Sequence, residues 1–282
     1  MIRECRREDF NKVIKYIFEK NAIAEYAFDT CPNEMEGIQQ LLEEAIDKND
    51  MKIIVSYEEK NINGVALLPC NDIENDCIGI FTTSSFKDIA MSMFQYVKDT
   101  LKGKSYYLYV NEQNKHIEEL KDYYKVNDLG KDMTLVLDTY SDSFINSYIQ
   151  ENKQEDSFEE FKEDFAVMHD ELFPDIYWSS KRILESLDDW KIILENNQDI
   201  LIGYVILVMN KDNIYIQQIG VKEEYRKNGY GHKLIRRVMN YAAMNRKSLI
   251  LDVETDNTSA ISLYKSLGFK TVKVKHLYQI KF

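Results

Sequence analysis

The chain has 282 residues, with 36 basic and 48 acidic side chains and a formal net charge of −12. This length predicts about two domains, and 44% hydrophobic with 30% charged residues is typical of a globular, water-soluble protein. The acidic balance argues against a nucleic-acid partner, and no apolar run reaches the about 20 residues that a membrane span requires.

The start of the chain is charged and lacks the apolar stretch of a signal peptide. Its four cysteines, at positions 5, 31, 70 and 77, contain no CxxC pair, and its four histidines are not spaced as metal ligands. We therefore expect a cytoplasmic protein with reduced thiols, no metal site and no membrane partner.

The predicted elements of the first half are mostly strands. Apolar runs over 51–55 and 63–68 predict two strands joined by a turn, and a third short strand follows over 77–81. Ala90, Phe94, Val97 and Leu101 then line one face of an amphipathic helix. A strand over 106–110, a second helix and a strand over 133–137 complete this half.

The second half repeats this order. Strands are predicted over 190–194, 203–208 and 214–221, followed by an amphipathic helix carrying Leu234 and Val238, a strand over 249–253, a helix over 258–267 and a final strand. An asparagine stands four residues after a strand valine in both halves, at Asn114 and Asn257. The repeated order predicts an α/β (α+β) fold used twice, with domains 1–138 and 139–282 and a junction within 138–156.

The loop between the strand 214–221 and its helix predicts a phosphate site. Gly229 and Gly231 let backbone amides approach an anion, and the start of a helix favours negative charge. Residues 222–247 contain eight basic and two acidic side chains, against the acidic balance of the whole chain. The alternative is a tight turn before a solvated basic helix. The spacing matches neither a Walker A loop nor GxGxxG.

Two motifs together identify a family. The sequence Arg226-x-x-Gly229-x-Gly231, followed by Asn257-x-x-Ala260-x-x-Leu263-Tyr264-x-x-x-Gly268-Phe269, resembles the GNAT superfamily of acyl-CoA-dependent N-acyltransferases. The second half matches along its whole length. The first half resembles a degenerate copy, because its loop 84–89 has no glycine and Lys121 stands where Tyr264 stands. The resemblance implies two tandem GNAT-like domains, each a mixed, mostly antiparallel sheet flanked by helices.

The resemblance also implies a co-substrate and the residues that hold it. Domain 139–282 is expected to bind acetyl-CoA, or another acyl-CoA, and domain 1–138 to bind none. Backbone amides of the glycine loop would wrap the pyrophosphate, and the preceding strand would pair with the pantetheine arm. Asn257 would contact the same arm, although it could equally cap the following helix. The implied set is Ile219, Gly220, Val221, Arg226, Lys227, Asn228, Gly229, Tyr230, Gly231, His232, Asn257 and Tyr264.

Tyr264 matches the family tyrosine that protonates the departing thiolate, although a core aromatic is the simpler interpretation. Asp252 stands where some N-terminal acetyltransferases of the family carry a glutamate, and we interpret it as a candidate base that acts through water. Glu254 is the alternative base. Gln217 and Gln218 occupy the position of the usual acidic residue on the previous strand, and neither amide can act as a base.

The expected acceptor region is the segment 161–180, where His169, Glu171 and Tyr177 are the candidate substrate contacts. The same pattern also fits an ordinary helix packed on the sheet. We expect a small-molecule primary amine as acceptor, attacking acetyl-CoA directly in a ternary complex. The alternatives are a protein or peptide N-acetyltransferase and a non-catalytic acyl-CoA-binding module. A monomer or a homodimer fits this sequence.

Overall fold

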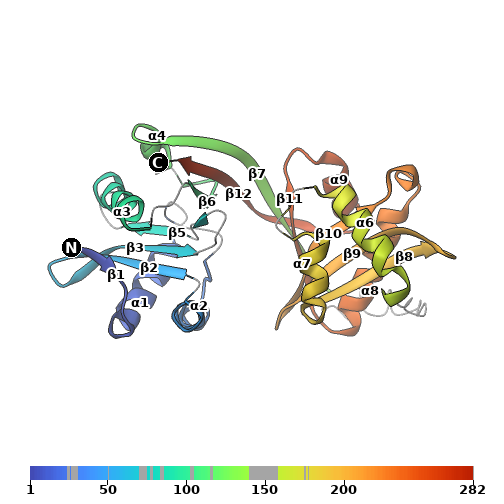
Figure 1. Cartoon of the computed structure of the whole chain (residues 1–282), viewed down its shortest axis with the longest axis horizontal. Helices are drawn as coiled ribbons and strands as arrows, with labels where there is room; N and C mark the ends of the chain where they lie inside the picture. The colour runs from blue at the N-terminus through green and yellow to red at the C-terminus, as the bar shows by residue number, and fades with distance from the viewer. Residues whose placement is uncertain are drawn as a thin grey trace. The chain divides into compact units, whose positions relative to one another are not determined.

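The computed structural model describes residues 1–23, 26, 31–49, 51–69, 75–76, 79–82, 86–101, 105–114, 117–139, 158–174, 176 and 178–281. The chain divides into two compact units: unit 1 comprises Met1–Asp132 and Lys273–Phe282, and unit 2 comprises Met133–Val272 (Figure 1). Each unit combines a sheet with helices, which confirms the predicted mixed α/β class. Within the described ranges, no helix is long and apolar enough to cross a membrane.

Unit 1 contains one antiparallel sheet of order β1-β2-β3-β5 and a second group of strands, β4-β6-β12-β7. The helices and strands that begin in this unit are β1 (Ile2–Glu4), η1 (Arg7–Asp9), α1 (Phe10–Asn21), α2 (Met35–Lys48), β2 (Met51–Glu58), β3 (Asn61–Pro69), β4 (Asn75–Asp76), β5 (Gly79–Thr82), α3 (Phe86–Leu101), β6 (Ser105–Asn111), α4 (Ile117–Lys121) and β7 (Lys125–Leu137). One apolar core joins them, with Val13, Ile38, Leu67 and Phe94 fully or almost fully buried.

Unit 2 follows the same plan. Its elements are η2 (Phe158–Phe161), α6 (Lys162–Leu172), α7 (Ser180–Glu185), η3 (Leu187–Asp189), β8 (Trp190–Asn197), β9 (Ile200–Met209), β10 (Asn213–Val221), η4 (Glu223–Tyr225), α8 (Tyr230–Met244), β11 (Ser248–Glu254), α9 (Thr258–Ser266) and the start of β12 (Lys270–Lys281). The strand order is β7-β11-β10-β9-β8. The pairing of β10 with β11 is parallel, and β9 pairs antiparallel with both β10 and β8.

Alternate residues of β9 enter two different cores. Val205 and Leu207 pack with α8, whereas Tyr204 and Ile206 pack with α6 and α7. Because side chains alternate along a strand, the two cores lie on opposite faces of the sheet. We call these the α8 face and the α6 face.

Two long strands, β7 and β12, belong to both units. The end of β7 places Leu135 and Leu137 in the core of unit 2, and the end of β12 pairs antiparallel with β6 in unit 1, from Lys275↔Asn111 to Lys281↔Ser105. Each sheet is thus completed by a strand that begins in the other unit. The sequence predicted strand only over 133–137 at this point, and the predicted junction falls mainly on 140–157, outside the described residues.

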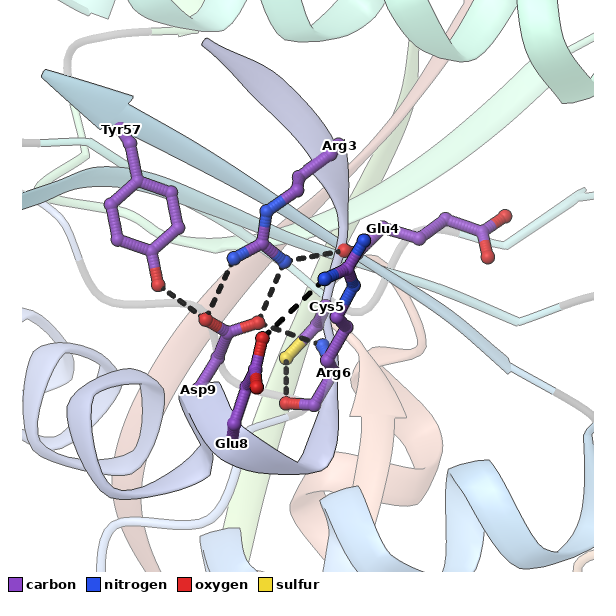
Figure 2. Close-up of polar contacts among 7 residues, drawn as sticks. All are labelled: Arg3, Glu4, Cys5, Arg6, Glu8, Asp9 and Tyr57. Carbon is purple, nitrogen blue, oxygen red and sulfur yellow. Dashed lines mark hydrogen bonds and ion pairs between the residues drawn. The ribbon is translucent and has the colours of Figure 1, made fainter.

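A buried carboxylate of η1 joins this short helix to β1 and β2 in unit 1 (Figure 2). Asp9 is 5% exposed and accepts two hydrogen bonds from the guanidinium of Arg3, at 2.7 and 2.8 Å. The Tyr57 hydroxyl donates to it at 2.7 Å and the Arg6 amide at 2.8 Å. These bonds, above all those from Arg3, hold the pKa of Asp9 well below its usual range. Every acceptor bond favours the ionised form.

We predict that Asp9→Asn lowers the free energy of unfolding of unit 1 by about 3 kcal/mol at pH 7, because it leaves Arg3 without its buried partner. Since the pKa of Asp9 is depressed by folding, its contribution is present above the usual carboxyl pKa of about 4 and is lost as pH falls below that value. The difference between variant and wild type therefore shrinks in acid. Urea unfolding followed by circular dichroism measures it.

The control is Glu8→Gln, because Glu8 and its ion-pair partner Arg6 are both 70% exposed and such pairs contribute little. Both tryptophans, Trp178 and Trp190, lie in unit 2, so their fluorescence follows that unit alone. Equal stability of Asp9→Asn and wild type at pH 7 would contradict the assignment.

Candidate active site

A fork between β10 and β11 forms the centre of the site. The two strands pair in parallel from Asn213↔Ser248 to Tyr215↔Ile250, while β10 continues to Val221 and β11 to Glu254. Beyond Tyr215, β10 stays paired with β9 as far as Val221↔Gly203, across a bulge between Ile216 and Gln218. The bulge bends β10 and ends its pairing with β11. The backbone groups of β10 that face the fork are therefore available to a ligand.

The glycine loop lies directly after β10. Lys227 and Gly229 both have left-handed backbone conformations, with φ of 62° and 85°, and Gly229 precedes the first residue of α8. The Lys233 amide donates to Gly229 O at 3.0 Å, which is the first backbone hydrogen bond of α8. The amides before Lys233 lie in the first helical turn, and they point out of the N-terminal end of the helix. The Arg226 side chain folds back, with Nε donating to Val221 O at 3.1 Å. The backbone amides at the start of α8 are thus suited to bind an anion.

Part of the basic charge in this region is used inside the protein. Glu195 of β8 is 2% exposed and forms ion pairs with Lys233 and Arg237, both from α8. Arg237 also donates to Leu194 O, and Lys247 to Asn210 O. The contacts of Lys233 and Arg237 with Glu195 and Leu194 hold α8 against β8. Part of the excess of basic residues over 222–247 therefore neutralises the buried carboxylate of Glu195.

The second motif lies beside the first. A Cβ added at Gly231 would approach Leu263 Cδ2 of α9 to 3.3 Å, so the glycine allows α8 and α9 to pack closely. His232 Nε2 lies 3.0 Å from the Ser266 hydroxyl, which itself donates to Leu263 O. Asn257 caps α9, because its side-chain oxygen accepts from the Ala260 amide at 3.1 Å. Capping, one of the two predicted roles of Asn257, is confirmed.

Tyr264 is buried in the core of the α8 face with Leu251, Val253 and Phe269. Its ring centroid lies 5.5 Å from that of Phe269. Burial raises the pKa of Tyr264 to about 12, so the phenol is protonated at neutral pH. Its hydroxyl makes no hydrogen bond with any residue that the structure describes.

Asp252 lies on the opposite face of β11. Its neighbours Leu251 and Val253 enter the α8 core, so alternation directs Asp252 to the α6 face. The Tyr215 hydroxyl donates to Asp252 Oδ2 at 2.9 Å, and the Thr134 hydroxyl of β7 donates to Oδ1. Sequence reasoning missed Tyr215 and Thr134. The sequence signal that could have identified them was a hydroxyl side chain among the apolar residues of a strand, at a position that alternation places on the other face of the sheet from the α8 core. Glu254 is exposed at the end of β11.

His169, a predicted substrate contact, is completely buried. Its Nε2 lies 2.8 Å from Trp178 O and its Nδ1 2.7 Å from the Tyr204 hydroxyl. A carbonyl only accepts, so Nε2 carries the proton and Nδ1 accepts from Tyr204. Burial lowers the pKa of His169, which keeps this tautomer neutral. The ring therefore ties α6 to β9 and to the backbone before α7.

The other two predicted acceptor contacts are placed differently. Glu171 is exposed at the end of α6, and Tyr177 lies outside the described residues. In the first half, loop residues 83–85 are also outside them. Lys121, the counterpart of Tyr264, pairs with Glu118 at 2.6 Å and lies over the Tyr278 ring. In the part of the chain that the structure describes, no three His, Cys, Asp or Glu side chains gather closely enough to hold a metal ion.

Residues 146–269 match the model of the acetyltransferase (GNAT) family. A probable N-acetyltransferase, san, from Drosophila melanogaster is 34% identical over 86 residues, which cover 28% of this chain and 47% of the relative. An N-alpha-acetyltransferase from Sulfurisphaera tokodaii is 40% identical over 67 residues, covering 23% of this chain and 40% of the relative. The chain thus spans less than half the length of either relative.

A solved structure is similar over the whole chain. It is a tandem GNAT protein from the clavulanic acid biosynthesis pathway, with a TM-score of 0.67 at 11% identity, and the match covers 100% of this chain and 98% of the other. At this identity the likeness establishes the fold alone. It confirms the predicted mixed α/β class over both halves.

Proposed function

We propose, from the premise that residues 146–269 belong to the acetyltransferase (GNAT) family, that this chain transfers an acetyl group from acetyl-CoA to the primary amine of a small molecule. The observation that supports this most directly is the fork between β10 and β11 beside the glycine loop of α8. A thioester arm fits along the unpaired side of β10, and a pyrophosphate fits the amides at the start of α8.

The residues present fit this co-substrate. Gly229 provides the left-handed turn, and Gly231 has no Cβ that would approach Leu263. Ile219, Gly220 and Val221 offer backbone groups to the arm, and Arg226–His232 offer the donors of the loop. Acetyl-CoA supplies an activated acyl carbon: a bond forms from the amine nitrogen to this carbon, the carbon–sulfur bond breaks, and coenzyme A leaves as its thiol.

Tyr264 is the proposed acid. Burial keeps its phenol protonated, and the hydroxyl has no competing partner among the described residues. A phenol with a pKa of about 12 gives its proton to a thiolate of ordinary pKa at a cost of about 5 kcal/mol. Donation of a hydrogen bond to the leaving sulfur is therefore its main contribution, and the proton follows as the carbon–sulfur bond breaks.

Asp252 is the proposed base, acting through a water molecule. A carboxylate has about four acceptor positions, and the hydroxyls of Tyr215 and Thr134 use two of them. The Asp252 carboxylate is an acceptor on the α6 face of the fork that can take up a proton from such a water. Removing a proton from a lysine-like amine at pH 7.4 costs about 4 kcal/mol, whereas an α-amine costs less than about 1 kcal/mol.

A second acceptor class is favoured by a specific finding. The Sulfurisphaera tokodaii relative is named an N-alpha-acetyltransferase, and the acidic surplus of this chain suits a basic peptide. Thiol release from acetyl-CoA, measured on a panel of 2-phenylethylamine, spermidine and short peptides with free α-amines, separates the two classes. Turnover of peptides alone would replace the small-molecule proposal.

We predict that calorimetric titration with acetyl-CoA shows one site per chain, because the glycine loop occurs only in the second half of the sequence. Gly229→Val should weaken this binding, since a branched side chain opposes a φ of 85°. Two sites per chain would show that the first half also binds the co-substrate. No binding would refute the proposed function.

We predict that Tyr264→Phe lowers kcat by about 10²-fold, in the range expected for loss of a general acid. The dissociation constant for acetyl-CoA should change little, because the ring and its packing remain. The matched control is Tyr241→Phe. It changes a half-buried tyrosine near the end of α8 and should keep wild-type turnover. Full turnover by Tyr264→Phe would eliminate the acid assignment.

We predict that Asp252→Asn lowers kcat/KM more for an alkyl amine than for an α-amine, because only the alkyl amine needs substantial deprotonation at pH 7.4. Initial rates on 2-phenylethylamine and on a short peptide give the two ratios. The two losses should differ by at least tenfold. Equal losses on both amines would mean that Asp252 supports the fold of the fork and takes no part in proton removal.

A further inference from the structure

We infer that Glu195 is a positioning residue for the anionic end of the co-substrate. It acts through Lys233 and Arg237 of α8, whose side chains it binds, and so fixes the direction of the backbone amides at the start of that helix. This inference rests on the proposed function. It adds a residue from β8 that lies outside both sequence motifs.

The first observation is a buried carboxylate with two cationic partners on one helix. Glu195 is 2% exposed, and it forms ion pairs with Lys233 and, at 3.5 Å, with Arg237. The two partners lie one turn apart on the same side of α8. Both are held at one point of β8, because a carboxylate is costly to bury without its partners. Glu195 therefore fixes the rotation of the first two turns of α8 about the helix axis.

The second observation is the row of residues beneath this part of α8. Glu195 stands opposite Gly203 of β9, and Gly203 stands opposite Val221 at the end of β10. A Cβ added at Gly203 would lie 3.0 Å from Leu234 Cδ1 of α8. Since carbon atoms pack at a separation of about 3.5–4.0 Å, the glycine allows α8 to lie close to β9. The helix thus contacts β10, β9 and β8, and its start reaches Glu195.

The third observation is that the other end of the glycine loop is held at the same row. Arg226 Nε donates to Val221 O at 3.1 Å, whereas Lys233 is bound by Glu195. The amides that would bind the pyrophosphate in the proposed function lie between these two anchors. A loop that is fixed before the ligand arrives loses less conformational freedom on binding. The two anchors therefore favour affinity.

The charge of Glu195 by itself predicts the opposite effect. A carboxylate repels a bound pyrophosphate, and it also neutralises part of the positive charge of Lys233 and Arg237. If Glu195 acted only through its charge, removal of that charge would strengthen the binding of acetyl-CoA. If Glu195 positions the start of α8, the same change weakens binding. The sign of the change in affinity therefore separates the two roles.

The test is Glu195→Gln, which keeps the size of the side chain and removes its charge. We expect the dissociation constant for acetyl-CoA, measured by calorimetry, to rise about tenfold because the loop must be ordered on binding. The kcat for the panel amine that the wild type uses fastest, at saturating acetyl-CoA, should stay within about twofold of wild type. General damage to unit 2 would lower kcat as well.

A second variant tests whether Glu195 acts through Lys233. Lys233→Met should also weaken acetyl-CoA binding, and the double variant should bind no more weakly than the weaker single variant, because the two residues act as one pair. If Glu195→Gln does not fold, as judged by tryptophan fluorescence, Lys233→Met decides alone: an unchanged affinity would overturn the inference.

Lys247→Met is the matched control. Lys247 donates to Asn210 O near the other end of α8, so this variant removes one cation and one tie to the sheet without touching the helix start. Its affinity for acetyl-CoA should stay within about twofold of wild type.

Three results would overturn the inference. The first is an unchanged or stronger affinity of Glu195→Gln for acetyl-CoA. The second is a double variant whose loss of affinity equals the product of the two single losses, since the residues would then act independently. The third is equal weakening by Lys247→Met, which would assign the effect to a general loosening of α8. If the wild type binds no acetyl-CoA, the proposed function itself fails before any variant is compared.

Discussion

The early end of one parallel strand pair determines the architecture of unit 2. β10 and β11 separate after Tyr215 and Ile250 because the bulge at Gln217 keeps β10 in register with β9 and bends it away. In most sheets an unpaired strand edge in the interior would be costly. Here the unpaired stretch is followed at once by the glycine loop and α8, so the same segment offers backbone groups to an elongated ligand and a helix start to its anionic end.

The fork also explains why the proposed acid and base lie on different faces. Along β11, Leu251 and Val253 enter the core that contains Tyr264, and Asp252 between them is directed to the other face. If the two strands stayed hydrogen-bonded along their whole length, their backbones would separate these two groups. Where the strands have separated, the acyl carbon can lie between them. In the proposed reaction, the sulfur leaves toward α9 and the amine arrives from the side of α6.

The elements that depend on local pattern were predictable. The order of strands and helices in unit 2 and the presence of a helix at the end of the glycine loop follow from periodicity and turn residues. The Asn257 cap was also among the predicted alternatives. The network of Thr134, Tyr215 and Asp252 was not predictable, because its members are up to 118 residues apart and meet only through strand register. The hydrogen bonds of His169 were not predicted for a related reason: no spacing rule connects His169 to its partners Tyr204 and Trp178.

The first half of the chain has no glycine loop, but strand β7, which begins in unit 1, connects it to the site. Thr134, which donates to Asp252, lies on β7, whose first eight residues belong to unit 1. Leu135 and Leu137 on the same strand fill the core under β11 and Tyr264. In return, the last residues of β12 complete the sheet of unit 1 beside β6. A second half that begins at residue 139 would therefore lack strand β7, the core residues Leu135 and Leu137, and the hydroxyl of Thr134 that donates to the proposed base. The first half supports the site because its final strand is part of it.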